Sequence, residues 1–257
     1  MEPIEKKDMY KIERLFDGWN ETPIWSCLQG YMGDAWADDA LNPTSAQIIV
    51  GDLCFFAGMP NLDLAKNIPT DFSSEFLLMI PQTEDWEVII EQAHVPNCEK
   101  IYRYAIKKEL DVFNRVKLQT YIEKLPTEYE LRMIDETLYK KAKTENWSKD
   151  LCSQFPSYQK YNDYGIGVMA LYGNEPVSGA SSYTVYDKGI EIEIDTKPDF
   201  RHKGLALACA SKLILECLDK GVYPSWDAHD MRSVALAEKL GYHLDKGYVT
   251  YIISNPN

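Results

Sequence analysis

The residues best suited to chemistry lie in one stretch, from Gly189 to Gly221. Isoleucine and glutamate alternate at 190–194, which is the two-residue period of a strand. Pro198 breaks this strand, and apolar residues return at helical spacing after Gly204. The turn between strand and helix carries Arg201, His202 and Lys203. Because free amide groups and the positive end of a helix dipole meet at such a turn, it suits a phosphate group.

Three carboxylates precede this turn on the same strand. Glu191, Glu193 and Asp195 are spaced two residues apart, so we expect their side chains on one face. Carboxylates at that spacing raise one another's pKa toward values useful to a general base at neutral pH. The alternative is a solvated strand face without a chemical role, just as Arg201 and Lys203 have an alternative as charges that solvate the turn.

Composition limits the classes of partner. The chain has 257 residues, 45% hydrophobic and 26% charged, which is enough for a globular fold with a core. The net charge of −13 argues against nucleic acid and anionic membranes as partners. A local cluster of basic residues around 197–203 instead fits a small phosphorylated cofactor.

Cysteine usage and the termini bear on the compartment. The six cysteines are scattered without a C-x-x-C pair, so we expect no metal site and a reducing environment. The first residues are charged and lack the apolar region of a secretory signal, and no run of residues has the length and apolarity of a membrane helix. We therefore expect a cytoplasmic protein.

The first half of the chain predicts an α+β domain at 1–125, of uncertain role. The pattern favours an amphipathic helix over 1–20, a hairpin over 45–60, a strand over 76–82, a helix over 85–94, and a strand pair at 101–106 and 112–123. Pro126 marks the boundary with a second domain, 126–257, because the pattern restarts after it.

The second half predicts a mixed α+β fold with a mostly antiparallel sheet flanked by helices. The expected elements are a strand at 129–135, a helix at 135–152 capped by Asp135, a loop or short helix at 153–163, a hairpin turning at 173–174, the strand and helix of the central stretch, a short strand near 223–228, a helix ending at Gly241, and a last strand at 247–253. The helix over 204–220 would form one parallel crossover.

Residues 201–206 read R-x-x-G-x-A, which resembles the diphosphate-binding loop of the GNAT acyltransferase superfamily. The motif follows a strand, opens a helix and precedes a second matching segment at 226–242. The wider wording, from E-I-E-I-D-T through Y-P-S-W-D-A to A-E-K-L-G-Y, more narrowly resembles the zwittermicin A resistance-type GNAT family. The resemblance covers most of the chain, and its specific part is the last third.

The resemblance implies acetyl-CoA as co-substrate. Pantetheine would pair with main-chain groups of Ile194, Asp195 and Thr196, where the central strand splays from its neighbour. Backbone amides would hold the diphosphate, with Arg201 and Lys203 beside them; the residues concerned are His202, Lys203, Gly204, Leu205 and Ala206. In the second segment, Asp230 and Ser233 occupy positions that contact the cofactor in many members, although Asp230 replaces the usual asparagine and cannot donate a hydrogen bond from its side chain.

A second departure concerns the general acid. Many GNAT enzymes carry a tyrosine where this chain has Ala237, so the proton for the leaving thiolate would come from Tyr242, Ser233 or water. A thiol with a pKa of about 8.5 leaves readily enough that this loss need not abolish activity.

The leading hypothesis is an acetyl-CoA-dependent N-acetyltransferase that acts by direct attack of a primary amine. The acidic protein favours a small cationic acceptor, and we expect a monomer or homodimer. The alternative is a non-catalytic acyl-CoA-binding regulatory module, which the replacements at Ala237 and Asp230 favour. A nucleotide-binding turn is a distant third, because neither G-x-G-x-x-G nor a Walker motif is present.

Overall fold

The computed structural model describes residues 1–70, 72 and 74–254, and these divide into two compact units. The first contains residues 1–103 and 247–257, and the second contains 104–246. The boundary expected after residue 125 therefore lies inside the second unit.

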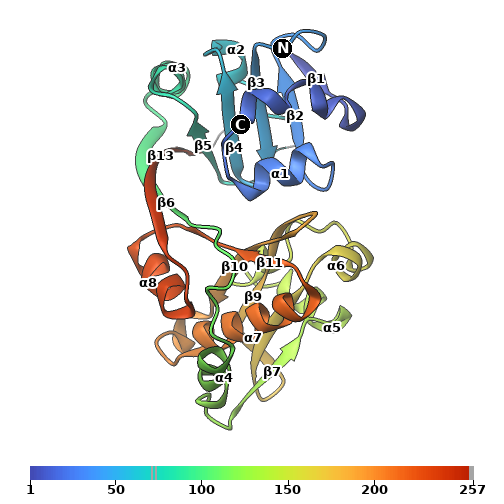
Figure 1. Ribbon diagram of the computed structural model, residues 1–257, viewed down its shortest axis with the longest axis vertical. Coiled ribbons are helices and arrows are strands. Elements are labelled where there is room, and N and C mark those ends of the chain that lie inside the picture. Colours follow the sequence, from blue (N-terminus) through green and yellow to red (C-terminus); the bar gives the residue numbers. More distant parts are fainter. Residues whose placement is uncertain (71, 73, 255–257) are drawn as a thin grey trace. The chain divides into compact units, whose positions relative to one another are not determined.

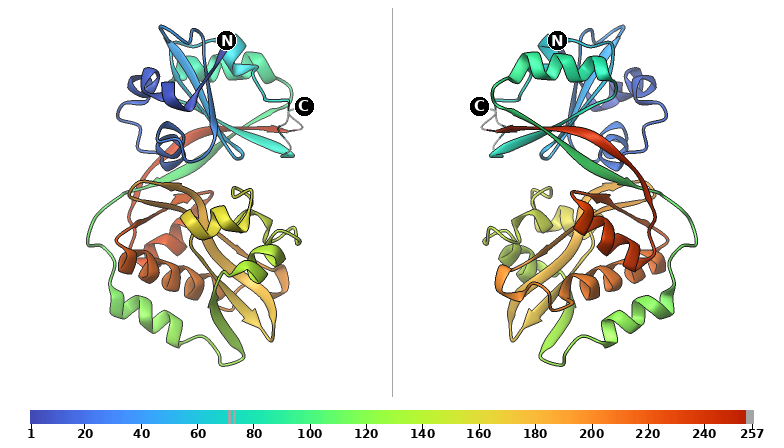
Figure 2. Two further views of the ribbon diagram at one scale, coloured as in Figure 1. Left: turned by 90° about the vertical axis from the view of Figure 1, so that its right-hand side faces the viewer. Right: turned by 90° about the vertical axis from the view of Figure 1, so that its left-hand side faces the viewer.

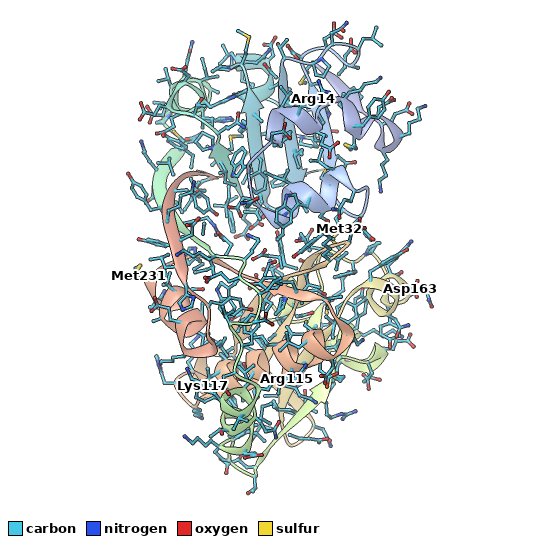
Figure 3. All side chains as sticks on the ribbon, viewed as in Figure 1. Arg14, Met32, Arg115, Lys117, Asp163 and Met231 are labelled. Carbon is cyan, nitrogen blue, oxygen red and sulfur yellow. The ribbon has the colours of Figure 1, made fainter. Side chains whose placement is uncertain are left out.

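Helix α4 (Arg115–Glu123) accounts for this difference, because it packs against α7 (Leu205–Lys220) within the second unit. An ion pair of 2.7 Å joins Arg115, labelled in Figure 3, to Asp219 of α7. Segment 112–123 was predicted to be a strand, and that prediction was wrong. Asn114 caps a helix there by accepting the N–H of Lys117. Leu118 is buried whereas Val116 is exposed, so residues two apart lie on different faces of a helix and not on one face of a strand.

The first unit is a sheet covered by short helices (Figure 1). Its strands lie in the order β1-β2-β3-β4-β5-β13-β6. Its elements are β1 (Glu2–Ile4), the 3-10 helices η1 (Lys6–Lys11) and η2 (Glu13–Phe16), α1 (Thr22–Leu28), β2 (Asp34–Ala37), β3 (Ser45–Val50), β4 (Leu53–Gly58), α2 (Leu62–Ala65), β5 (Phe76–Pro81), α3 (Glu84–His94), most of β6 (Cys98–Ile106) and most of β13 (Leu244–Ser254). The hairpin of β3 and β4, the strand β5 and the helix α3 are confirmed as predicted.

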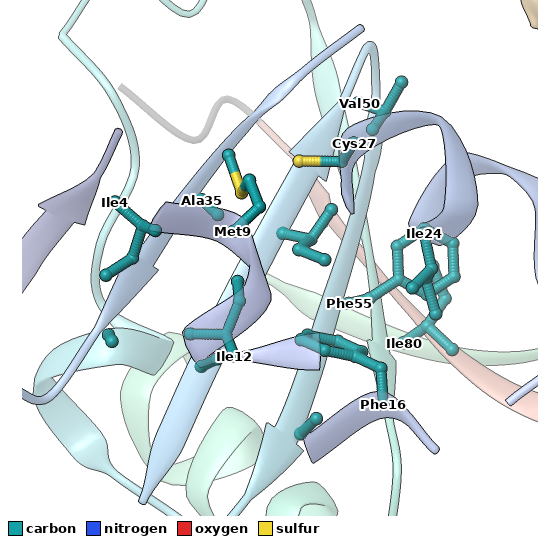
Figure 4. Close-up of a cluster of buried hydrophobic side chains, with 14 of the residues drawn as sticks. Ile4, Met9, Ile12, Phe16, Ile24, Cys27, Ala35, Val50, Phe55 and Ile80 are labelled. Carbon is teal, nitrogen blue, oxygen red and sulfur yellow. The ribbon is translucent and has the colours of Figure 1, made fainter. Parts of the chain in front are cut away.

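The helix predicted over residues 1–20 is not an α-helix. Met9, Ile12 and Phe16 of the expected apolar stripe are buried, as Figure 4 shows, but they lie in and between two 3-10 helices. Ile12 N–H donates to Met9 O and Leu15 N–H to Ile12 O, which are i to i+3 bonds. Over so short a stretch, a 3-10 helix with about 3.0 residues per turn and an α-helix with about 3.6 bury the same side chains, so the apolar spacing does not distinguish them.

The second unit has a sheet with the order β11-β10-β9-β8-β7. After α4 its elements are β7 (Tyr129–Met133), α5 (Glu136–Ala142), η3 (Lys149–Leu151), α6 (Tyr158–Tyr164), β8 (Gly167–Tyr172), β9 (Glu175–Tyr186), β10 (Gly189–Thr196), η4 (Pro198–Phe200), α7, β11 (Tyr223–Ser225), β12 (Asp227–Ala228) and α8 (Met231–Leu240). Helix α7 lies on one face of the sheet, and α5 and α6 lie on the other (Figure 2).

The predicted class is confirmed: both sheets are dominated by antiparallel pairs and flanked by helices. Strand β10 pairs antiparallel with β9 and parallel with β11, so the crossover through α7 is the predicted one. Asp135 caps α5, and α7 ends at Gly221 with a φ of 69°. The last strand differs, because β13 pairs with β5 of the first unit, with Tyr251 opposite Met79.

Gly189→Ala tests the contact between β10 and β11. An added Cβ would clash with the backbone oxygen of Tyr223, which cannot rotate away as a side chain does. We expect the variant to lose about 1–3 kcal/mol of unfolding free energy in urea titrations, the range for overpacking a filled site. Wild-type stability would contradict the close pairing at Gly189.

Candidate active site

One strand pairing of the second unit, between β10 and β11 (Figure 1), ends before β10 does. Strand β11 pairs with β10 at three positions, the last of which places Glu191 opposite Ser225. The chain then turns away into β12, whose partner is β6. Within the part of the chain that the structure describes, no strand pairs with the edge of β10 from Ile192 to Thr196 on this side. The splay expected from the resemblance is therefore present.

Backbone alternation decides which residues of β10 face the opening. Lys188 O accepts the N–H of Tyr223 in β11, whereas Lys197 N–H donates to Val177 O in β9. Even-numbered residues therefore direct their backbone groups toward the β11 side, and odd-numbered ones toward β9. Ile192, Ile194 and Thr196 face the open edge.

This alternation changes the expected set of main-chain contacts. Asp195 directs its backbone toward β9, and its carbonyl accepts a hydrogen bond of 3.1 Å from Ser178 Oγ. Both backbone groups of Thr196 are engaged, since its N–H donates to Asp195 Oδ1 at 2.7 Å and its carbonyl accepts from Arg201 Nε at 3.2 Å. Of the three residues expected to pair with pantetheine, Ile194 is the one whose backbone suits that role.

The turn that follows presents backbone amides to solvent. His202 and Gly204 have φ values of 62° and 81°, in the left-handed region, and Arg201 to Gly204 are exposed. Gly204 is the N-cap of α7 and supplies no side-chain cap, while Leu205 is buried and anchors the helix. The first N–H groups of a helix have no acceptor within it, so the amides from His202 to Ala206 are available to an anion.

The cations of the turn point to different places. Arg201 Nε reaches back to Thr196 O, and Lys203 Nζ lies 4.6 Å from the centre of the Phe200 ring. The exposed turn thus carries positive charge, but the guanidinium is already hydrogen-bonded to the strand.

The three carboxylates of β10 have different surroundings. Glu191 is buried, opposite Thr184 and Ser225, whereas Glu193 and Asp195 are half-buried. The ladder between β9 and β10 has a bulge between Glu191 and Ile192, with the extra residue on the β9 side. Glu191 therefore lies where β11 leaves β10, opposite Ser225, and we call this place the apex of the splay. Glu193 lies just beyond it on β10.

The pKa of Asp195 is raised, mainly because burial disfavours its charged form. Asp150 adds to this rise, while the Thr196 N–H and the Arg201 guanidinium oppose it. The expected cause, repulsion from Glu191 and Glu193, is wrong for this group. Asp195 therefore interacts with Thr196 and Arg201 at the end of β10, and not with Glu191 at the apex.

Hydroxyl groups surround the apex. Tyr186 Oη and Ser225 Oγ are hydrogen-bonded at 3.1 Å, and Tyr242 Oη donates to Pro224 O at 2.5 Å. Burial raises the pKa of Tyr242, and the neighbouring Tyr223, Cys217 and Glu191 raise it further. Tyr242 thus holds its proton in a buried bond that anchors β11, which is a poor arrangement for a general acid.

The second predicted segment is organised by a helix cap. Asp230 accepts the backbone N–H groups of Arg232 and Ser233, both at 2.9 Å, and its carboxylate also pairs with the Arg232 guanidinium. Ser233 Oγ accepts from Trp226 Nε1 at 3.0 Å. The pattern Asp-x-x-Ser before an apolar run is an N-cap signal, which explains Asp230 without a cofactor contact.

Sequence reasoning missed Ser178, Thr184 and Ser225. Ser225 would have been found by aligning the short strand Y-P-S in parallel with G-I-E, because that register places it opposite Glu191. Thr184 follows from the two-residue turn at 187–188, because counting back from that turn places it opposite Glu191. Ser178 had no such signal, since its pairing with Thr196 lies beyond the β9 bulge.

The described residues also bear on two other classes of site. No helix there has the length and apolarity to cross a membrane. No group of three or more His, Cys, Asp or Glu side chains there is arranged to hold a metal ion.

Comparison with known proteins identifies the family. The family model for GNAT acetyltransferase matches residues 13–251. The chain belongs to the GNAT acetyltransferase family. The match includes most of both units, so the family relationship is not confined to residues 126–257. It supports the superfamily resemblance, while the narrower zwittermicin A resistance type stays a prediction.

Relatives of similar length support this membership. The "uncharacterized N-acetyltransferase YdfB" of Bacillus subtilis (strain 168) is 27% identical over 98% of both chains. A GCN5-related N-acetyltransferase-like protein from Streptococcus suis is 43% identical, with a TM-score of 0.90 over 95% of this chain and 98% of that one. A tandem GNAT protein from the clavulanic acid biosynthesis pathway shares the fold, with a TM-score of 0.61 at 8% identity over 99% and 98%. The two-sheet arrangement is consistent with tandem GNAT-like domains.

Asp195→Asn tests the burial of this carboxylate. We expect the variant to be more stable than wild type at pH 7–8, because a raised folded-state pKa means that folding disfavours the charged form, and asparagine still accepts from Thr196 N–H. The difference should fade as pH falls toward about 4, the ordinary Asp pKa, where both states of the wild type become protonated.

Urea unfolding across this pH range measures the effect, with the exposed Asp199→Asn as the matched control. Asp199→Asn should show no comparable pH-dependent gain. If Asp195→Asn is less stable than wild type at neutral pH, the half-buried carboxylate stabilises the fold and the argument is wrong.

Proposed function

We propose that this protein is an acetyl-CoA-dependent N-acetyltransferase that acetylates a primary amine of a small cationic acceptor. The observation that carries the proposal is the juxtaposition of an open strand edge at Ile194 with the exposed amides of the turn from His202 to Gly204. A cofactor with a diphosphate and a peptide-like arm has the chemistry that both features require. Membership of the GNAT family favours an enzyme over a binding module.

The residues present fit acetyl-CoA. The amides from His202 to Ala206 would hold the diphosphate, helped by the dipole of α7. The main chain of Ile194 would pair with an amide of pantetheine, as a neighbouring strand would. The edge of β10 between Ile194 and Glu191 would support the rest of the arm, since the pairing with β11 ends at Glu191 and Ser225.

The apex offers a base for the acceptor. An ammonium group must lose a proton before its nitrogen can attack a thioester, and Glu191 or Glu193 would accept that proton. The amine nitrogen then bonds to the acetyl carbon and loses its second proton to solvent, the carbon–sulfur bond breaks to leave the amide, and the thiolate takes a proton. The net charge of −13 would draw a cationic acceptor to the protein.

The source of the last proton follows from the buried groups. Ala237, where many relatives have tyrosine, is fully buried, and Tyr242 donates to Pro224 O. Solvent or Ser233, whose oxygen accepts from Trp226 and whose proton is free to be donated, would therefore protonate the thiolate. Because the thiol pKa is about 8.5, water suffices at neutral pH.

The cysteines support a reducing compartment, the cytoplasm, as the place of action. All six are free, and the pKa of Cys54, Cys209 and Cys217 is raised by burial, which keeps these thiols unreactive. We propose a monomer or homodimer.

A thiol-release assay with acetyl-CoA and a panel of primary amines tests the function, alongside calorimetry with acetyl-CoA. Turnover that depends on the amine, together with binding, supports the proposal. Binding without turnover on any amine would favour the regulatory module, for which Ala237 speaks. If neither binding nor turnover is observed, both the enzyme and the regulatory module are excluded.

Gly204→Ala tests the turn. A φ of 81° is strained for a residue with a Cβ, although space around Gly204 is open. We expect acetyl-CoA affinity to fall about tenfold, which corresponds to 1–2 kcal/mol of strain. Gly204→Asn should lose less, because asparagine tolerates this conformation.

Gly221→Ala is the matched control, because Gly221 caps the other end of α7 with a φ of 69° and equally open surroundings. It should lose stability without losing affinity in isothermal titration. Equal affinity of wild type and Gly204→Ala would contradict diphosphate binding at this turn.

Tyr242→Phe tests the assignment of the general acid. Loss of the bond to the buried Pro224 carbonyl should lower the unfolding free energy by about 1–3 kcal/mol. We expect kcat to stay within about twofold of wild type at a temperature where the variant is folded. A fall in kcat of about a hundredfold or more, with unchanged KM, would make Tyr242 the acid.

A further inference from the structure

We propose that Arg201 is a positioning residue that braces the corner between β10 and α7, and that it does not supply the counter-charge for a diphosphate. The inference rests on the proposed function, since it concerns how the same turn is prepared for its ligand. It differs from the expectation that Arg201 would contact the phosphate directly.

The first observation is where the guanidinium goes. Arg201 Nε donates to Thr196 O at 3.2 Å, across the intervening helix η4. The side chain thus folds back onto the strand five residues earlier. It closes the loop that contains Pro198 and Phe200. A lysine has an aliphatic Cε where arginine has its Nε–H, and its ammonium lies one atom further out on a flexible stem, so it does not keep this bond in the same geometry.

The second observation is that Thr196 is held from several directions. Its Oγ1 and Ser178 Oγ are 2.7 Å apart, and the same Ser178 hydroxyl lies 3.1 Å from Asp195 O. Its N–H is bonded to Asp195 Oδ1 at 2.7 Å. Ser178 is fully buried in β9, so the network ties the carbonyl that Arg201 binds to the middle of the sheet.

The charge of Arg201 also acts on the strand. Its guanidinium lowers the pKa of the half-buried Asp195 carboxylate against the effect of burial. Lys203, which is exposed as Arg201 is, rests on the Phe200 ring at 4.6 Å. The Arg201 Nε–H is thus held by Thr196 O, whereas the Lys203 ammonium has only a ring contact to give up when it moves toward an anion.

The brace matters because the next residue is strained. His202, with a Cβ, has a φ of 62°, and such a conformation persists only where the surroundings determine it. Arg201 precedes it directly and is fixed to Thr196. Holding this corner would keep the backbone of His202 to Ala206 ordered before any ligand arrives, which lowers the ordering cost of binding.

Four variants separate a brace from a counter-charge: Arg201→Lys, Arg201→Ala, Ser178→Ala and Lys203→Gln. The first keeps the charge but loses the bond, and the third removes the support of Thr196 with no change of charge. Lys203→Gln removes an exposed charge and leaves the brace intact. The two measurements are calorimetry with CoA at low and high salt, and amide hydrogen exchange of residues 196–206 in the intact, unliganded protein.

We expect Arg201→Lys to bind CoA about tenfold more weakly than wild type and as weakly as Arg201→Ala, at both salt concentrations. Exchange in peptide 196–206 should be faster in Arg201→Lys and in Ser178→Ala. Lys203→Gln should keep wild-type exchange, with a loss of affinity that salt diminishes, because a screened charge contributes less.

Wild-type affinity in Arg201→Lys, with a salt-sensitive loss in Arg201→Ala, would overturn the inference, because the charge alone would then account for binding. Unchanged exchange in Arg201→Lys would overturn it too. If wild-type protein does not bind CoA, the proposed function fails, while exchange in the unliganded protein still decides whether Arg201 braces the turn.

Discussion

The site depends on where one strand pairing ends. Strand β11 follows β10 for three residues and then leaves it at Ser225, which opens the edge of β10 next to the start of α7. The buried bond from Tyr242 to Pro224, the bond from Trp226 to Ser233 and the contact between Gly189 and Tyr223 all act on the short segment that diverges. Without this divergence, the backbone of Ile194 would bond to a neighbouring strand and could not receive a ligand.

Much of the second unit follows from local signals in the sequence. The Ile-Glu alternation marks β10, glycines end α7 and α8, and Asp135 caps α5, because each of these depends on a few neighbouring residues. The failures have physical reasons as well. The apolar residues of 112–123 alternate in sequence but belong to a helix that buries Leu118 and exposes Val116. The stripe at Met9, Ile12 and Phe16 has too few turns to distinguish a 3-10 helix from an α-helix.

The details of the site depend on pairings between distant segments, which local patterns do not encode. Which backbone groups face the opening follows from the register of β10 against β9 and β11, and this register turns the backbone of Ile194 toward the open edge and that of Asp195 toward β9. Arg201 has the residue type of a phosphate ligand, yet its position in the fold directs it to Thr196. Asp230 likewise has a carboxylate that a helix cap already uses.

A crystal structure with CoA tests the central claim most directly. We predict diphosphate oxygens within about 2.7–3.2 Å of the backbone nitrogens between His202 and Ala206, and an amide of pantetheine paired with the main chain of Ile194. The thiol should then lie near Glu191 and Ser225. CoA bound elsewhere, with the amides of the turn facing solvent, would contradict the account.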